Sequence, residues 1–210
     1  MKDGTEKPLQ GSGGIGIINY GAGNIFSLTA ALDRLKVTYG MVNTENDLGK
    51  YSHIIIPGVG HAGAAMEKLK ATGLVEAIKK LTKPVLGICV GMQLITEHSE
   101  EGNAALLDIV PVKTKKFDKD LNIKIPHMGW NAVSPKNNSL FEGVEDNTQF
   151  YFVHSYFIEY NPTFDIASAD YGLKFSAAIQ KDNFYGVQFH PEKSGKAGEL
   201  ILKNFSNLSL

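Results

Sequence analysis

The first half of the chain alternates short apolar runs with stretches of helical periodicity. The apolar runs, which predict buried strands, are Ile15–Tyr20, His53–Ile56 and Pro84–Ile88. Helices are predicted from about Asn24 to Leu35, and over Ala62–Leu69, Leu74–Leu81 and Val90–His98. Strands that alternate with helices indicate parallel βαβ units, with helices on both faces of the sheet.

The first of these helices has a defined start. Gly21–Asn24 is predicted to form a turn, and the Asn24 side chain can cap the helix that follows. The apolar positions of this helix recur at helical spacing, and they are Phe26, Leu28, Ala31, Leu32 and Leu35.

The second half of the chain contains strand-like runs and few helices. The runs are Val110–Phe117, Ile125–Val133, Phe150–Ile158, Ala177–Gln180 and Tyr185–Phe189, and a last helix is predicted near Ala197–Leu208. We therefore expect one α/β domain over residues 15–210, with a mixed, mostly parallel sheet and antiparallel strands added late. Residues 1–14 are rich in glycine and charge, and we expect a flexible leader or a cloning remnant there.

Composition restricts the class of protein. The 210 residues are 43% hydrophobic and 20% charged, a balance typical of a soluble globular domain. The formal charge is -1, and no basic block exists that could neutralise nucleic-acid phosphates. No apolar run approaches the roughly 20 residues that a membrane span needs. A single cysteine excludes an internal disulfide and fits a reducing compartment, so we expect a cytoplasmic protein.

That cysteine, Cys89, lies in a pattern typical of a nucleophile. The segment Gly87-Ile88-Cys89-Val90-Gly91 joins a predicted strand to a predicted helix, and this is the arrangement of a nucleophile elbow. Its glycines let strand and helix approach closely, and helix N-terminal N–H groups favour the thiolate. The Val90 N–H would point to the place where an oxyanion forms. The alternative is a buried structural cysteine, the commoner role of a lone cytosolic thiol.

Among six histidines, His190 is the best candidate for the base. It ends the predicted strand Tyr185–Phe189 and is followed by Pro191 and Glu192. In an extended segment, residues two positions apart point to the same side, so the Glu192 carboxylate can orient the His190 ring toward Cys89. By itself His-Pro-Glu is more often a surface turn. A metal site is the rival explanation, but no histidine pair has helical ligand spacing and the cysteine has no partner.

The loop Pro57–Gly60 follows a buried strand and precedes a helix. Its two glycines leave the backbone free to approach a ligand, so the peptide of Val59 and Gly60 can donate a second N–H to an oxyanion. A phosphate-binding loop is the competing explanation, but the Lys-Ser/Thr ending of that motif is absent.

Together these segments resemble the class I (triad) glutamine amidotransferases. GICVGMQ (87–93) and FHPE (189–192) are typical of the class. YGAGN (20–24), PHMGWN (126–131) and HPEKS (190–194) resemble one branch of it, the glutaminase subunits of imidazole glycerol phosphate synthase from histidine biosynthesis. The resemblance covers the chain from Ile15 nearly to its end and implies the fold of that class. One position departs from the branch, where Ala62 replaces a frequent aromatic residue.

The resemblance assigns roles to individual residues. It implies Cys89 as nucleophile, His190 as general base and then acid, and Glu192 as the orienting carboxylate. The oxyanion would be bound by Val90 and by the Val59–Gly60 peptide. The remaining residues that it implies contact the glutamine substrate, and these are Gly58, Gln93, Glu101, His154, Ser155 and Tyr156.

The resemblance also implies a partner and no cofactor or metal. The partner is a (β/α)8-barrel cyclase subunit, which takes up the ammonia and makes imidazole glycerol phosphate and AICAR. The glutaminase would be nearly idle until the cyclase binds its nucleotide ligand. Asn24, Gly129 and Trp130 are expected at the interface of this heterodimer.

Three other functions remain open from sequence. A related glutaminase could supply ammonia to another acceptor, such as a surface-polysaccharide sugar, while keeping every motif. An inactive scaffold could bind and shape a partner, although the intact triad argues against it. A cysteine hydrolase or peptidase could use the same elbow, but Gln93, Glu101 and the segment 152–156 disfavour it.

Overall fold

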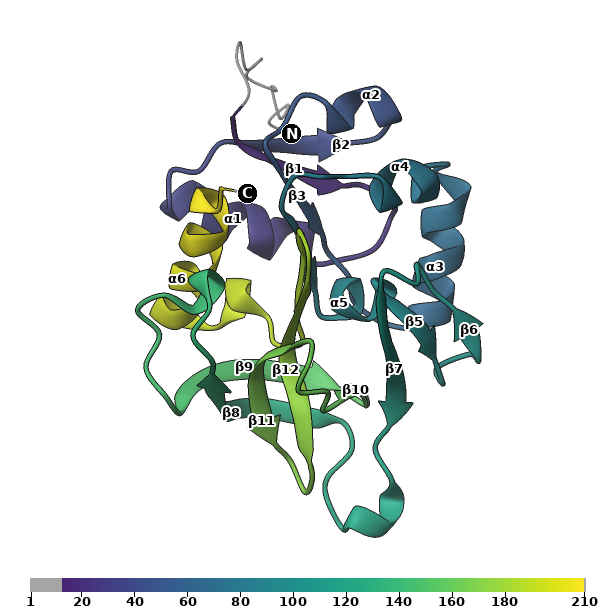
Figure 1. The fold of residues 1–210 in the computed structure, drawn as a ribbon, viewed down its shortest axis with the longest axis vertical. Helices are drawn as coiled ribbons and strands as arrows, with labels where there is room; N and C mark the ends of the chain where they lie inside the picture. The colour runs from purple at the N-terminus through teal and green to yellow at the C-terminus, as the bar shows by residue number, and fades with distance from the viewer. Residues whose placement is uncertain (1–12, 210) are drawn as a thin grey trace.

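The computed structural model describes residues 13–209, and a five-stranded parallel sheet forms one half of it (Figure 1). The strands, in spatial order, are β2 (Tyr39–Val42), β1 (Ile15–Ile18), β3 (His53–Ile56), β4 (Val85–Ile88) and β13 (Phe184–Val187). All but β2 are buried along their whole length. Parallel strands covered on both faces need continuous apolar runs, which explains the sequence pattern.

Helices lie on both sides of these strands. Figure 1 shows α1 (Ile25–Arg34) and α6 (Gly195–Asn207) on one side, and α3 (Ala62–Ala71), α4 (Val75–Lys79) and α5 (Val90–Leu94) on the other. A short helix, α2 (Glu45–Leu48), follows β2. The predicted cap of α1 is confirmed, since Asn24 Oδ1 accepts from the Ser27 N–H at 3.3 Å.

The second half of the fold is mainly antiparallel. Its strands are β5 (Thr96–Ser99), β6 (Ala104–Ala105), β7 (Val110–Lys116), β8 (His127–Pro135), β9 (Thr148–His154), β10 (Tyr156–Glu159), β11 (Asp165–Asp170) and β12 (Lys174–Lys181). From β13 the sheet continues through β12, β10, β7, β5 and β6, and β11 joins β12 to the β8–β9 pair. Single turns of 3-10 helix form η1 (Lys119–Leu121), η2 (Ser139–Phe141) and η3 (Pro191–Lys193). The predicted mixed α/β architecture is confirmed.

Several predicted elements were wrong in extent. The helix expected over Val90–His98 ends at Leu94, because the next residues form β5 and pair with β7. The β-branched Thr96 suits this strand, and its hydroxyl donates to the Gln93 carbonyl at 2.7 Å. The strand expected over Phe150–Ile158 is broken at Ser155 into β9 and β10.

The apolar positions of α1 differ in their burial. Leu28, Ala31 and Leu32 are buried, whereas the Phe26 ring is 83% exposed. The segments that form β2, α2 and β11 were not predicted at all, because each is short and lacks a continuous apolar run. The two strands are regular because they pair with neighbours, β2 with β1 and β11 with β12 and β8.

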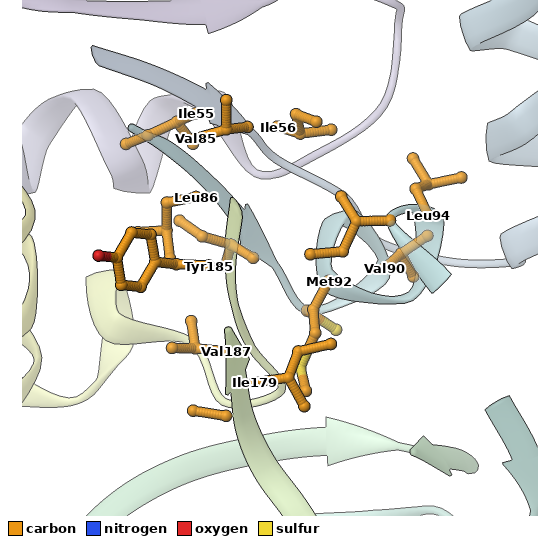
Figure 2. Packing of buried hydrophobic residues seen from close by; sticks show 14 of the residues in the cluster. Ile55, Ile56, Val85, Leu86, Val90, Met92, Leu94, Ile179, Tyr185 and Val187 are labelled. Carbon is orange, nitrogen blue, oxygen red and sulfur yellow. The ribbon is translucent and has the colours of Figure 1, made fainter. Parts of the chain in front are cut away.

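The core surrounds strand β4. Figure 2 shows side chains from β3, β4, α5, β12 and β13 packed against one another, among them Ile55, Leu86, Met92, Ile179 and Val187, all fully buried. Burying one such side chain stabilises the fold by about 1.5–3 kcal/mol. The strand that leads to Cys89 is therefore held from both faces.

Three glycines allow the chain to fold tightly where β4 turns into α5. A Cβ at Gly91 would lie 1.8 Å from the Ile56 carbonyl oxygen, and one at Gly87 would lie 2.4 Å from the Gly91 oxygen. A Cβ at Gly58 would lie 2.5 Å from the Gly91 nitrogen. Any side chain at these positions would separate β3, β4 and α5, so the predicted reason for the flanking glycines is confirmed.

The N-terminal segment of the chain is described only from Gly13. The leader predicted over residues 1–14 lies outside the described residues except for its last two. The Gly14 carbonyl accepts hydrogen bonds from the backbone N–H groups of Ser52 and His53, so Gly14 is attached to the start of β3. Within residues 13–209, no helix has the length and apolar character to cross a membrane.

The close approach at Gly91 predicts a large stability difference between two alanine substitutions. Gly91→Ala forces a Cβ into the Ile56 carbonyl, and we expect the free energy of unfolding to fall by about 3 kcal/mol or more. The control is Gly49→Ala, at an exposed helix end whose φ is -67° and where a Cβ meets nothing closer than 3.6 Å. Urea denaturation of both proteins is the measurement. A Gly91→Ala protein as stable as the control would contradict this account.

Candidate active site

Cys89 occupies a strained turn at the end of the central strand. Its φ of 54° and ψ of -109° are rare for a residue with a side chain, and such conformations cost of the order of 1–3 kcal/mol. The Cys89 N–H donates to the Val187 carbonyl at 2.8 Å, which fixes the turn to β13. The thiol is 3% exposed. This geometry is that of the predicted elbow, with the sulfur at the carboxyl edge of a parallel sheet.

His190 reaches Cys89 because β4 and β13 are neighbours. The two strands run parallel with Ile88 opposite Val187, so the chain leaves both at the same edge of the sheet. His190 Nδ1 lies 2.8 Å from Glu192 Oε1, and both side chains are at most 3% exposed. Because the carboxylate accepts the Nδ1 proton, Nε2 is left for Cys89. Nε2 is buried and has no hydrogen-bond partner among the described residues.

The electrostatics of the His190 ring favour the protonated form. Burial by itself lowers the pKa of His190, but the neighbouring Cys89 sulfur and the Glu192 carboxylate outweigh burial and raise this pKa to about 10. The ring can therefore hold a proton beside the sulfur at neutral pH and donate it to a leaving group.

A serine that sequence reasoning missed fixes the segment after His190. Ser194 Oγ donates to the His190 carbonyl at 2.6 Å and accepts from the Tyr151 N–H at 3.0 Å. The His190 N–H in turn donates to the Tyr151 carbonyl at 2.9 Å. These bonds attach the His-Pro-Glu segment to β9. In the sequence, the only signal for this attachment is the serine that follows HPEK.

The predicted oxyanion loop is held at its start by Tyr20. Burial raises the pKa of the Tyr20 phenol far above its ordinary value, so the hydroxyl stays protonated and donates to the Pro57 carbonyl at 2.5 Å. At the other end, Glu101 Oε2 accepts from the Ala62 N–H at 2.6 Å. Between these bonds, Gly60 has a φ of 86° with open space around its Cα, and Val59 is 40% exposed.

A cavity of about 370 Å³ lies in front of Cys89. Ten of the predicted site residues line it, namely Val59, Gly60, Cys89, Val90, Gln93, Glu101, His154, Ser155, Tyr156 and His190. Pro126, Val153 and Lys193 also line it and were not predicted. Glu192 lies behind His190, and Gly58 borders a small separate cavity with Asn24 instead of the main one. The volume is ample for one amino acid.

The polar groups of the cavity include one that lacks a partner. Gln93 lines the cavity, and its Oε1 atom is buried without a hydrogen bond from any described residue. An unpaired buried acceptor is costly, so an N–H donor brought close to this oxygen would be favourable. The side-chain amide of glutamine is such a donor.

The residues expected at a partner interface have different surroundings. Trp130 is 56% exposed and contacts the Tyr151 ring edge to face at 6.0 Å. Gly129 has a φ of 134° and open space around its Cα. The Asn24 side chain is used as the cap of α1.

Two buried histidines beside the cavity predict acid sensitivity. Burial lowers the pKa of His154 to about 3 and that of His127 to about 4, whereas an unfolded histidine titrates near pH ~6.5. Below that pH the unfolded chain binds protons that the folded protein does not bind, so the free energy of unfolding decreases as the pH falls. Each histidine contributes up to about 1.4 kcal/mol per pH unit.

The measurement is urea denaturation of the wild type and of His154→Asn between pH ~4 and ~6. We expect the variant to show a slope shallower by about 1.4 kcal/mol per pH unit, because it lacks one of the two titrating rings. Parallel curves for the two proteins would show that His154 does not titrate in this way.

Comparisons with known proteins agree with this geometry. The family model described as "Glutamine amidotransferase class-I" matches residues 16–207. The protein "Imidazole glycerol phosphate synthase subunit HisH" of Bacteroides thetaiotaomicron is 48% identical over 197 residues, which are 92% of this chain and 99% of the relative. The protein of the same name from Haemophilus influenzae is 50% identical over 192 residues, covering 91% and 96% of the two chains.

Solved structures share the fold at lower identity. A crystal structure of a glutamine amidotransferase aligns with a TM-score of 0.72 and 15% identity, covering 92% of this chain and 97% of the other. The structure of PurLQS from Thermotoga maritima aligns with a TM-score of 0.69 and 15% identity, covering 93% and 98%. The match of the family model over nearly the whole chain, together with relatives of about half identity, shows that this chain belongs to the class-I glutamine amidotransferase family.

Proposed function

We propose that this chain is the glutaminase subunit of imidazole glycerol phosphate synthase. In this role it hydrolyses glutamine to glutamate and ammonia, and passes the ammonia to a (β/α)8-barrel cyclase in histidine biosynthesis. The observation that carries the proposal is the assembled set of Cys89, His190 and Glu192 in a chain that is similar over 91–92% of its length to HisH subunits.

The first half of the reaction uses the sulfur and the imidazole. His190 takes the thiol proton, and the Cys89 sulfur adds to the amide carbon of glutamine. The negative charge that develops on the amide oxygen is stabilised by the N–H of Val90 and by the Val59–Gly60 peptide. His190 then gives its proton to the departing nitrogen, and ammonia leaves. The raised pKa of His190 supports this donor role.

The second half removes the acyl group. Water loses a proton to His190 and attacks the γ-glutamyl thioester, and the resulting tetrahedral adduct expels the Cys89 thiolate as glutamate forms. Glu192 stays hydrogen-bonded to Nδ1 throughout and holds the ring in one orientation. The proton that left with ammonia is replaced by the one that His190 takes from water, so Cys89 and His190 regain their starting protonation state and the cycle needs no external reductant or oxidant.

Recognition of glutamine is proposed to involve the polar groups around the cavity. The unpaired Gln93 oxygen supports a contact with the substrate amide. Glu101 lines the cavity and provides a carboxylate that can attract the substrate's α-ammonium group, while Ser155 and Tyr156 border the same space. Because Glu101 also binds the Ala62 N–H, substrate recognition and the end of the oxyanion loop share one side chain.

A partner surface is supported by exposed apolar side chains. In the described part of the chain, the large hydrophobic residues with high exposure are Phe26, Val59, Met128 and Trp130. Trp130 contacts Tyr151, above whose ring lies Lys193 of the cavity wall. Apolar and aromatic residues of this kind are enriched in interfaces, so we place the cyclase over this region. A cytoplasmic location is part of the proposal and is consistent with the single free thiol.

The nucleophile assignment predicts a separation of two activities. In a complex with the cyclase, Cys89→Ala should lower glutamine-dependent synthesis by at least about 1000-fold, because the thioester cannot form. Synthesis from added ammonia should continue at the wild-type rate, since the cyclase is unchanged. The control is His98→Asn, whose ring bonds Asn103 away from the cavity and whose loss should leave both rates intact. Glutamine-dependent synthesis that survives in Cys89→Ala would refute the assignment.

The orienting role of Glu192 predicts a kinetic effect without a binding effect. Glu192→Gln keeps the shape of the side chain and removes the charge that helps to raise the pKa of His190. We expect kcat for glutamine hydrolysis to fall about 100-fold while KM changes less than about threefold. The matched control is Glu199→Gln, which changes a surface carboxylate paired with Arg34. Steady-state kinetics of both variants in the complex would show whether Glu192 acts on the base.

A further inference from the structure

Gln188 is a fully buried polar residue whose side chain faces the nucleophile. It follows Val187, which pairs with Ile88, so the register of β13 and β4 brings Gln188 beside Cys89. Gln188 Nε2 lies 3.7 Å from Cys89 Sγ, within hydrogen-bond distance for sulfur. The backbone N–H of Gln188 already bonds to Ala177, so its side chain is not needed to complete the sheet.

The orientation of the Gln188 amide is fixed by a main-chain carbonyl. The Tyr156 carbonyl can only accept, so the nitrogen of the Gln93 amide must face it, at 3.3 Å. The same Gln93 nitrogen lies 3.2 Å from the Gln188 amide, which must therefore present its oxygen. Only the NH2 group of Gln188 is then left to face the sulfur, and it can act only as a donor.

A second set of hydrogen bonds holds the same carbonyl. His154 Nδ1 lies 2.7 Å from the Tyr156 oxygen, and His154 Nε2 lies 2.9 Å from His127 Nδ1. The carbonyl again only accepts, so His154 donates through Nδ1 and accepts from His127 through Nε2. Burial keeps both rings neutral by lowering each pKa, which preserves these directions at neutral pH. In each hydrogen bond that links β8 to Gln188, only one of the two partners can thus be the donor.

We propose that Gln188 is a positioning residue for the nucleophile, whose amide N–H fixes the position of the Cys89 sulfur and stabilises the sulfur when it is negatively charged. A donor aimed at an anion in a buried site acts without the cost of reorienting a solvent molecule. A carboxamide also fits better than a cation, because it assists the sulfur without competing with His190 for a proton. The inference rests on the proposed role of Cys89 as nucleophile.

Two substitutions remove the donor in different ways. Gln188→Glu keeps the shape and the acceptor for Gln93 but turns an acceptor toward the sulfur. Gln188→Met has similar length, carries no charge and leaves the core filled. If the buried carboxylate of Gln188→Glu impairs folding, Gln188→Met still shows the effect of losing the N–H donor. Gln149→Glu makes the same chemical change at an exposed position of β9 and is the control.

Alkylation by iodoacetamide measures the sulfur directly, because Cys89 is the only cysteine of the chain. We expect the alkylation rate of the folded protein to fall about tenfold or more in Gln188→Met and further in Gln188→Glu. In the complex with the cyclase, kcat for glutamine hydrolysis should fall about 100-fold while KM changes less than about threefold. Ammonia-dependent synthesis and the Gln149→Glu control should match the wild type.

Other outcomes would overturn the inference. A Gln188→Met protein with a native circular dichroism spectrum and a wild-type alkylation rate would exclude contact between this amide and the reactive sulfur. A rise in KM at unchanged kcat would instead assign Gln188 to substrate binding through Gln93. If the wild-type complex itself released no glutamate from glutamine, the proposed function would fail, which is a different result from failure of the variants alone.

Discussion

The in-register pairing of β4 with β13 is the contact on which the candidate site depends. These strands come from segments about a hundred residues apart, yet they leave the sheet together because they are parallel. Cys89 continues one of them, and Gln188 and His190 continue the other. A slip of one residue would turn every side chain after Val187 to the opposite face, and the base would point away from the sulfur. The chemistry is therefore a property of strand register as much as of residue type.

Around this pairing, the elbow combines local strain with tight tertiary packing. Cys89 adopts backbone angles that are unfavourable by themselves, and the surrounding contacts hold the residue in this conformation. Gly91 touches the Ile56 carbonyl, and the apolar side chains of β3, β4 and β13 close over the strand behind it. A core this dense cannot deform gradually. It holds the nucleophile in one position and leaves adjustment to the loops in front of it.

The sequence could predict those parts of the site whose residues lie next to one another along the chain. The glycines around Cys89 and the His190-Pro191-Glu192 segment each carry a local reason for their composition, and the structure brings them together at one cavity. Contacts made only through the sheet had no such signal. Nothing near Gln188 in the sequence reveals that it faces Cys89, and the strand that follows α5 resembles a helix until its pairing with β7 is known. Phe26 has helical spacing too, but local periodicity does not reveal whether another element covers it.

The bonds at the two ends of the oxyanion loop have a thermodynamic consequence. Tyr20 fixes Pro57 and Glu101 fixes Ala62, so rearrangement without loss of these bonds is confined to Val59 and Gly60 and their immediate neighbours. Ordering two residues of backbone costs roughly 2–4 kcal/mol, which corresponds to a change of about 30- to 1000-fold in an equilibrium constant. Because the mobile part of the loop is so short, its ordering alone can change the rate of the reaction by no more than this factor. The interaction energy of a few side chains at a subunit interface is enough to supply such a change.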